Sequence, residues 1–139
     1  MLSKPMTEAK KSILVVDDNA DIRELLMEVL TQAGYEVAVA DDGIGAMTAL
    51  KKRVPDLIIL DIVMPVIDGP HLIHVIRAAD NPEMWQVPIL ICSASEKIDE
   101  LLAASEFDIA PEDCLRKPFE VATLLRRVAE RLERADTAR

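Results

Sequence analysis

A carboxylate stands at the end of an apolar run in "LIILDIVMPVIDG", the stretch that covers residues 57–69. Its first four residues are Leu or Ile, a continuous apolar run that is typical of a strand buried on both faces of a sheet. Asp61 follows directly. Because an unpaired charge is costly to bury, this carboxylate requires either a partner or a function.

Apolar strands of the same kind alternate with helical segments along the rest of the chain. We expect strands at 13–16, 36–40, 56–60, 87–94 and 113–117. We expect helices at 20–33, 44–53, 70–79, 96–104 and 120–135, where apolar residues recur at helical spacing. Gly34 stands where a helix-ending glycine belongs, and Pro70 suits a first helical turn. Five such units predict an α/β domain whose parallel sheet is covered by helices on both faces.

Composition and charge exclude several classes of protein. The 139 residues are enough for one domain with a core, and 50% hydrophobic with 29% charged residues is ordinary for a soluble protein. No apolar run approaches the roughly 20 residues of a membrane span, and the N-terminus lacks the apolar centre of a signal peptide. We therefore expect a cytoplasmic protein that does not engage a membrane. The net charge of -9 argues against direct binding of nucleic acid.

The two cysteines, Cys92 and Cys114, are far apart in the sequence. Two residues at this spacing indicate neither a disulfide framework nor a zinc cluster. We predict two buried thiols.

Polar residues converge on the edge of the predicted sheet where ligands bind. In open parallel sheets that edge lies beyond the carboxyl ends of the strands, at the switch in strand order. The residues at these ends are Asp17, Asp18, Asp61, Ser93, Ala94 and Lys117. Each of them alone has an ordinary structural interpretation, such as a helix cap, a turn residue or a solvated lysine. Their joint arrangement from four separate points of the chain favours a functional site.

The chemistry of this group points to metal-assisted handling of a phosphoryl group. Three carboxylates at one edge repel one another, and a divalent cation removes that conflict. Hard oxygen ligands suit Mg²⁺, and a nearby lysine ammonium suits a phosphoryl oxygen. The chain has neither a GxxxxGK[ST] nor a GxGxxG loop, so nucleotide binding is disfavoured.

Four motifs with these residues stand in order along the chain: "ILVVDDN" (13–19), "LIILDIVMPVIDG" (57–69), "ILICSA" (89–94) and "LRKPF" (115–119). Together they resemble the receiver domain of two-component response regulators, in particular the stand-alone, single-domain members. The resemblance covers about residues 12–134, which leaves tails at 1–11 and 135–139. It implies a flavodoxin-like, doubly wound, five-stranded parallel sheet of strand order 2-1-3-4-5 with five helices.

By this resemblance Asp61 is the phospho-acceptor and also one of the metal ligands. Asp18 would bind Mg²⁺ directly, and Asp17 would act mainly through water or by positioning. The backbone carbonyl of Val63 would complete the metal shell.

The resemblance also assigns the groups that would contact the phosphoryl oxygens. Ser93 and the backbone N–H of Ala94 would bind one oxygen, and Lys117 would bind another. The peptide bond between Lys117 and Pro118 is expected to be cis, which a following proline permits.

The implied function is that of a signalling switch rather than an enzyme. A sensor histidine kinase or a histidine phosphotransfer protein would donate the phosphoryl group. The domain would promote only its own phosphorylation and dephosphorylation, and it would signal through a downstream protein partner or by onward phosphotransfer.

Two other functions are weighed against this one. A pseudo-receiver would use the same fold as a constitutive interaction module, although such a module has no need for the acidic set. A small phosphohydrolase would also form an aspartyl phosphate, but those of similar fold place a second Asp two residues after the nucleophile. Val63 occupies that position here, which disfavours repeated hydrolysis.

One departure from the family pattern concerns how phosphorylation is sensed. Receivers usually carry Tyr or Phe three residues before the lysine, and this chain has Cys114 there. Phe107 is a candidate substitute, against the simpler interpretation that it packs under a loop. The connection at 105–114 also lacks the usual glycine. We therefore expect a different output mechanism in this region, or a partner that reads mainly the loops near Asp61.

Overall fold

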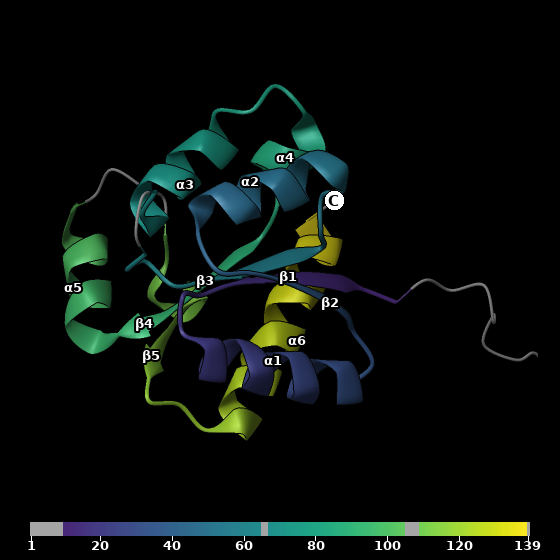
Figure 1. Cartoon of the computed structure of the whole chain (residues 1–139), viewed down its shortest axis with the longest axis vertical. Coiled ribbons are helices and arrows are strands. Elements are labelled where there is room, and N and C mark those ends of the chain that lie inside the picture. The colour runs from purple at the N-terminus through teal and green to yellow at the C-terminus, as the bar shows by residue number, and fades with distance from the viewer. Residues whose placement is uncertain (1–9, 65–66, 105–108, 139) are drawn as a thin grey trace, which may run out of the picture.

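A five-stranded parallel sheet forms the centre of the molecule (Figure 1). The structure is a computed structural model, and it describes residues 10–64, 67–104 and 109–138. The strands are β1 (Ser12–Val16), β2 (Glu36–Ala40), β3 (Leu57–Leu60), β4 (Ile89–Ala94) and β5 (Cys114–Lys117). They lie in the order β2-β1-β3-β4-β5, and every neighbouring pair is parallel. The predicted flavodoxin-like order is therefore confirmed.

The helices follow the predicted segments with one addition. They are α1 (Ala20–Gln32), α2 (Gly43–Lys52), α3 (Gly69–Arg77), α4 (Pro82–Trp85), α5 (Ser95–Ala104) and α6 (Val121–Ala138), with a 3-10 turn η1 (Pro111–Asp113). The prediction of five helices missed α4, a single turn that is too short to produce an apolar period. Its local signals are present, because the Asn81 side chain accepts a hydrogen bond from the Glu83 N–H and Pro82 follows the cap.

Helix α6 also exceeds its predicted length. It continues to Ala138, so most of the segment expected as a C-terminal tail is helical. Within the described ranges, no helix is both long and apolar enough to cross a membrane.

Short polar side chains fix where the long helices start. Asn19, Asp42 and Asp68 each accept a hydrogen bond from the backbone N–H three residues later, at the first turns of α1, α2 and α3. Such caps satisfy N–H groups that have no partner inside the helix. Gly34 follows the end of α1 with a φ of 100°, as predicted for a helix-ending glycine.

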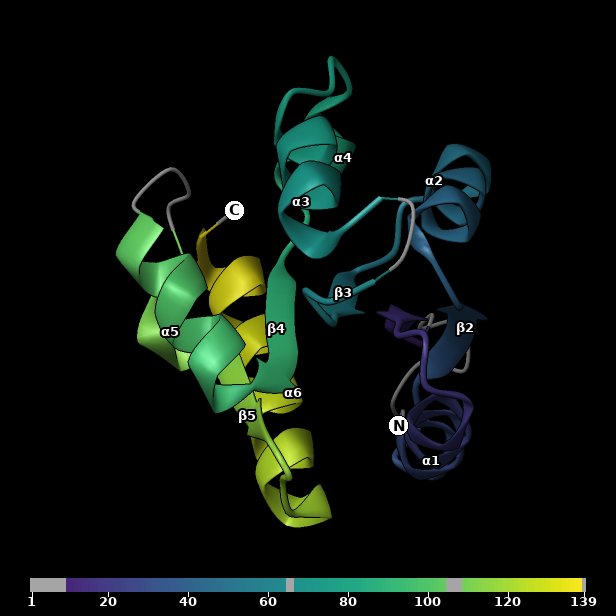
Figure 2. The same ribbon diagram turned by 60° about the vertical axis from the view of Figure 1, so that its left-hand side comes forward.

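Two apolar layers hold the sheet. Helices α1 and α6 cover one face, and α2, α3 and α5 cover the other (Figures 1 and 2). The first layer includes Ile13, Val15, Leu26, Leu30, Leu124 and Val128, and the second includes Leu14, Val16, Leu50, Leu72, Ile76 and Ile98. Every residue of β1 and β3 is buried. The carboxyl ends of these two central strands are therefore rigidly placed next to each other.

The two cysteines are buried free thiols, as predicted. They lie on adjacent strands but belong to opposite apolar layers, Cys92 to that of α1 and Cys114 to that of α5. Burial raises the pKa of Cys92 to about 12 and that of Cys114 to about 11. Both thiols are therefore protonated and unreactive at neutral pH.

The chain turns back on itself between β3 and α3. The Gly69 N–H donates to the Ile62 carbonyl over 2.9 Å, which brings the first turn of α3 against the residue that follows Asp61. A Cβ at Gly69 would lie 2.5 Å from the Ile62 Cα and 3.1 Å from the Asp61 carbonyl oxygen. Only a residue without a side chain fits this approach.

We expect Gly69→Ala to lower the free energy of unfolding by about 1–3 kcal/mol, the usual cost of overpacking a tight contact. The backbone of Ile62 would have to move to admit the new methyl group. Urea unfolding followed by circular dichroism measures the change. Gly45→Ala in α2 is the control, because its nearest neighbour would be a side-chain oxygen at 3.2 Å and alanine is favoured over glycine in a helix. Equal unfolding free energies for Gly69→Ala and the parent protein would contradict the prediction.

Candidate functional site

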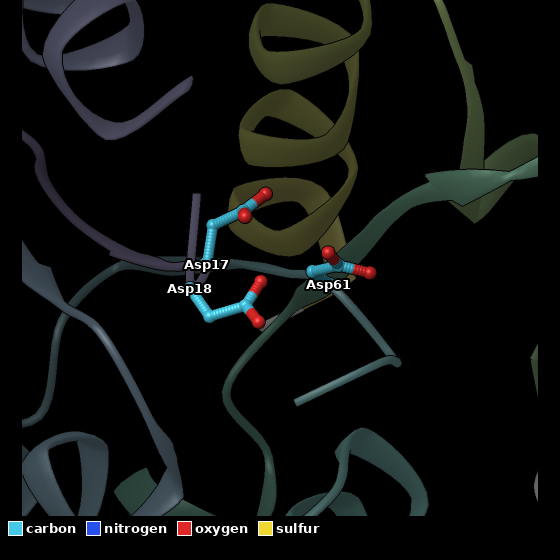
Figure 3. Close-up of side chains that lie close together, drawn as sticks. All are labelled: Asp17, Asp18 and Asp61. Atoms are coloured by element: carbon cyan, nitrogen blue, oxygen red, sulfur yellow. The ribbon is translucent and has the colours of Figure 1, made fainter. Parts of the chain in front are cut away.

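Three carboxylates meet beyond the ends of β1 and β3 (Figure 3). Asp17 and Asp18 follow β1, and Asp61 follows β3. One oxygen of each residue lies within 4.8 Å of the others. Asp17 is 3% exposed and Asp61 is 7% exposed, whereas Asp18 is exposed to solvent. The sequence-predicted acidic set is thus assembled at the switch point of the sheet, where β1 lies between β2 and β3.

Lys117 connects the two buried carboxylates from the end of β5. Its Nζ lies 2.7 Å from Asp17 Oδ2 and 3.1 Å from Asp61 Oδ2. Burial lowers the pKa of Lys117, but the hydrogen bonds and charges of the two aspartates outweigh burial, so the pKa is raised overall. The ammonium therefore remains charged at neutral pH, and it supplies the partner that a buried Asp61 requires.

Asp61 is also held through its other oxygen. The Ser93 hydroxyl donates to Asp61 Oδ1 over 2.8 Å, and the Val63 N–H donates to the same oxygen over 3.1 Å. Ser93 lies at the end of β4 and is 2% exposed. Both oxygens of Asp61 are hydrogen-bonded, so the carboxylate has one fixed orientation. The role of the Val63 carbonyl as a metal ligand stays a prediction, as does that of the Ala94 N–H.

Two contacts at Asp17 were not predicted from the sequence. The Asn19 N–H donates to Asp17 Oδ1 over 2.9 Å, and Arg23 Nη1 donates to the Asp17 backbone carbonyl over 2.8 Å. The sequence contained a hint of the Asn19 contact, because Asn19 is the capping residue of α1. Arg23 had a weaker one: it lies one turn into α1, and helical side chains lean toward the N-terminus of their helix. Together these groups fix the turn that carries Asp17 and Asp18.

The arrangement can hold a metal ion. Three carboxylates and one ammonium have a formal charge of -2, and they come from three different strands. The exposed Asp18 gives solvent access to one side of the group. Carboxylate oxygens are hard ligands that favour hard divalent cations.

The region of the expected aromatic residue differs from the family pattern in the structure too. Cys114 is buried, and its Sγ lies 3.8 Å from the Ala110 carbonyl oxygen. The suggested substitute, Phe107, lies outside the described residues. The Lys117–Pro118 peptide bond is cis, as expected.

Strand order and site together define the class of this protein: a doubly wound α/β domain with an acidic, lysine-bearing site at its switch point. Comparison with protein families identifies it further. A sequence model described as "Response regulator receiver domain" matches residues 13–129. The chain belongs to the family of response regulator receiver domains.

Curated relatives from mycobacteria support this membership. The chain is 40% identical over 122 residues to "Transcriptional regulatory protein PrrA" of Mycobacterium tuberculosis, which covers 88% of this chain and 50% of PrrA. It is 36% identical over 131 residues to "DNA-binding response regulator MtrA" of the same species, which covers 94% of this chain and 54% of MtrA. The chain thus spans about half the length of the curated relatives it matches.

Solved structures of similar size agree in fold. A putative response regulator from Chloroflexus aurantiacus is 36% identical with a TM-score of 0.78, and the match covers 90% of this chain and 99% of that one. The chemotaxis response regulator CheY4 of Vibrio cholerae is 32% identical with a TM-score of 0.74, covering 88% and 98%.

We expect Lys117→Met to lower the free energy of unfolding at pH 8 by about 3–5 kcal/mol, because it leaves two buried carboxylates without their countercharge. Lys11→Met is the matched control. It removes an exposed ion pair with Asp136, which should contribute at most about 1 kcal/mol. Urea unfolding of both variants in metal-free buffer measures the difference, and equal effects would contradict the assignment.

The stability difference between the parent protein and Lys117→Met should also depend on pH. The folded-state pKa of Lys117 is raised, so its contribution to stability is fully present below the unfolded pKa of about 10.4. The contribution is lost as the pH rises through the folded-state pKa. The stability difference between the parent protein and Lys117→Met should therefore be constant from pH 7 to 9 and shrink by pH 11.

Proposed function

We propose that this receiver domain is a phospho-acceptor switch in which Asp61 receives a phosphoryl group from a phosphohistidine. A sensor histidine kinase or a histidine phosphotransfer protein would be the donor. The observation that carries the proposal is the set of contacts on Asp61, whose carboxylate is within hydrogen-bond reach of both Lys117 and Ser93 beside the acidic pair. Family membership agrees with it.

Mg²⁺ is the proposed metal, held by Asp18, Asp61 and the Val63 carbonyl, with Asp17 acting mainly through water or by positioning. The spacing fits with a small adjustment. Opposite ligands of one Mg²⁺ are separated by about 4.2 Å, twice the metal–oxygen bond length, and the carboxylate oxygens lie within 4.8 Å. When bound, Mg²⁺ would neutralise charge on the phosphoryl oxygens.

The protein groups would position and neutralise the phosphoryl group. An oxygen of Asp61 would form a bond to phosphorus while the phosphorus–nitrogen bond of the donor breaks, which gives an acyl phosphate. The Lys117 ammonium and the Ser93 hydroxyl already lie against the carboxylate, and they would transfer to phosphoryl oxygens with little rearrangement. The Ala94 N–H would supply a further donor.

Val63 bears on what happens to the acyl phosphate. Its side chain is apolar and the residue is 50% exposed, two positions after Asp61, where phosphohydrolases of similar fold carry an acid/base aspartate. The chain offers no carboxylate there to activate water. This favours a switch that loses its phosphoryl group slowly over a hydrolase with repeated turnover.

The output is proposed to reach a protein partner or to continue by onward phosphotransfer, in the cytoplasm. The net charge of -9 opposes direct contact of this domain with nucleic acid. PrrA and MtrA have names that indicate transcriptional regulation and DNA binding, and the similarity covers about half of each of those proteins.

One observation favours a second function. Cys114 cannot provide the aromatic side chain that receivers usually use in signalling, and a pseudo-receiver that acts as a constitutive interaction module would not need it. Metal binding separates the two functions, because a constitutive module has no use for Mg²⁺.

We expect the protein to gain the mass of one phosphoryl group when it is incubated with acetyl phosphate and millimolar Mg²⁺. Asp61→Asn should abolish the gain, because the amide is not a nucleophile toward phosphorus, and EDTA should abolish it in the parent protein. Intact-protein mass spectrometry measures both. Asp68→Asn is the control: Asp68 is an exposed helix cap near the site, and Asn is an equally good cap.

Two outcomes count against the proposal. A phosphoryl gain that persists in Asp61→Asn would exclude Asp61 as the acceptor. Titration calorimetry measures Mg²⁺ binding. If the parent protein does not bind Mg²⁺ at millimolar concentration, the pseudo-receiver is favoured.

A further inference from the structure

Arg116 lies at the side of the site, between β5 and α5. The register of the sheet pairs Arg116 with Ser93 and pairs Lys117 with Ala94. Residues paired across parallel strands lie on the same face of a sheet. The neighbour of Ser93, whose hydroxyl contacts Asp61, is therefore an arginine rather than a small or apolar residue.

The Arg116 guanidinium reaches from β5 to the first turn of α5. Its Nη1 donates to the Ser95 carbonyl oxygen over 3.0 Å, and its Nη2 lies 2.9 Å from Asp99 Oδ1. Ser95 begins α5 only two residues after Ser93, and Asp99 lies one turn further along. These two contacts are called the Arg116 bridge below. Figure 2 shows α5 lying beside β4 and β5, the elements that the bridge connects.

The Arg116 bridge is weak enough for a small structural change at the site to break it. The Arg116 side chain is 45% exposed and that of Asp99 is 66% exposed. Exposed ion pairs contribute little because water screens both charges. The contact with Ser95 is a charge-assisted hydrogen bond to the backbone, which gives the bridge a fixed geometry. A weak but directional contact of this kind can hold one arrangement of a loop without preventing a second.

Cys114 occupies the position where receivers usually carry the aromatic residue that responds to phosphorylation. The thiol belongs to the same apolar layer as Ile98 and Leu101 of α5, and it is buried beneath the helix. It presents no large side chain whose rotation would report on the site. Arg116 is two residues further along β5, at the point where the strand meets the junction of β4 and α5.

We propose that Arg116 is a positioning residue that couples Ser93 and Ala94 to α5. This inference rests on the proposed phospho-acceptor function. In the unphosphorylated protein the bridge holds Ser95, and with it Ser93, in the arrangement where the Ser93 hydroxyl contacts Asp61. Phosphorylation draws Ser93 and the Ala94 N–H toward the phosphoryl oxygens. The carbonyl of Ser95 then moves away from Arg116, and the first turn of α5 is released.

The expected effect follows from the strength of such pairs. An exposed pair contributes about 0.5–1 kcal/mol, which biases two arrangements by about two- to fivefold. Arg116→Ala should therefore bind beryllium trifluoride, an analogue of the phosphoryl group, about two- to fivefold more tightly in the presence of Mg²⁺. Phosphorylation by acetyl phosphate should be faster by a similar factor. Amide hydrogen exchange in the first turn of α5 should rise before any phosphorylation.

Matched variants separate coupling from general damage. Asp99→Asn removes the ion pair and leaves the contact with Ser95, so its effect should be smaller in the same direction. Arg116→Lys keeps the charge and should restore part of the parent behaviour. Glu100→Gln is the control, because Glu100 is an exposed acid on the same helix that pairs with Lys97 of α5 itself. It should leave both analogue affinity and hydrogen exchange unchanged.

The outcomes distinguish failure of the inference from failure of the proposed function. A parent protein that takes no phosphoryl group on Asp61 contradicts the function. A parent protein that is phosphorylated, with Arg116→Ala and Asp99→Asn equal to it in analogue affinity and in exchange, overturns the coupling. Weaker binding of the analogue to these variants also overturns it, because the bridge would then support the phosphorylated arrangement. Urea unfolding shows whether each variant is folded. If Arg116→Ala does not fold, the inference is tested with Asp99→Asn alone.

Discussion

The contact of one ammonium with two buried carboxylates is the interaction on which this structure depends. Asp17 and Asp61 are both almost fully buried, and Lys117 lies against each of them. Charges can be buried in this way only if their partners are held at hydrogen-bonding distance. The strand order meets that requirement, because β1 and β3 are neighbours and β5 reaches the same edge with only β4 between. Ser93, at the end of β4, fills the gap with a hydroxyl that also contacts Asp61.

The apolar layers make this arrangement rigid. Every residue of β1 and β3 is buried between helices, so the ends of these strands have little freedom to separate. Fixed dipoles and charges stabilise a transferring phosphoryl group without the cost of reorganising solvent. The exposed parts of the site are instead Asp18 and the junction of β4 and α5. The rigid groups are thus those that would bind and orient, and the exposed ones are those that would admit the donor or report the result.

Local signals in the sequence predicted most of the fold, and long-range pairing explains what they missed. The apolar run "LIIL" and the helix-ending Gly34 depend on neighbouring residues alone, and their interpretation is confirmed. The helix α4 was missed because one turn has no period, although Asn81 is a capping signal. The acidic set was predicted from strand ends, but the pairing of Lys117 with Asp17 joins residues 100 positions apart. The partners of Arg116 likewise depend on the register of β4 against β5, which no local pattern specifies.

If Asp61 is the phospho-acceptor, as proposed, the domain must convert the new charge there into a change at its surface. The size of that change depends on the contacts that hold the surface elements in place. Conversion requires an element with two arrangements that differ little in energy. Where a buried aromatic ring is used, packing sets the energy difference between the two arrangements, and dissolved salt does not screen packing. In this protein the difference would come from the Arg116 bridge, which consists of an exposed ion pair and a hydrogen bond. Ions in solution screen the ion pair. With Cys114 buried and small, the coupling in this protein lies at the surface, within direct reach of any partner that binds α5. Such a partner would compete for Arg116 or Asp99, and by thermodynamic reciprocity a partner that opens the bridge would also favour phosphorylation of Asp61.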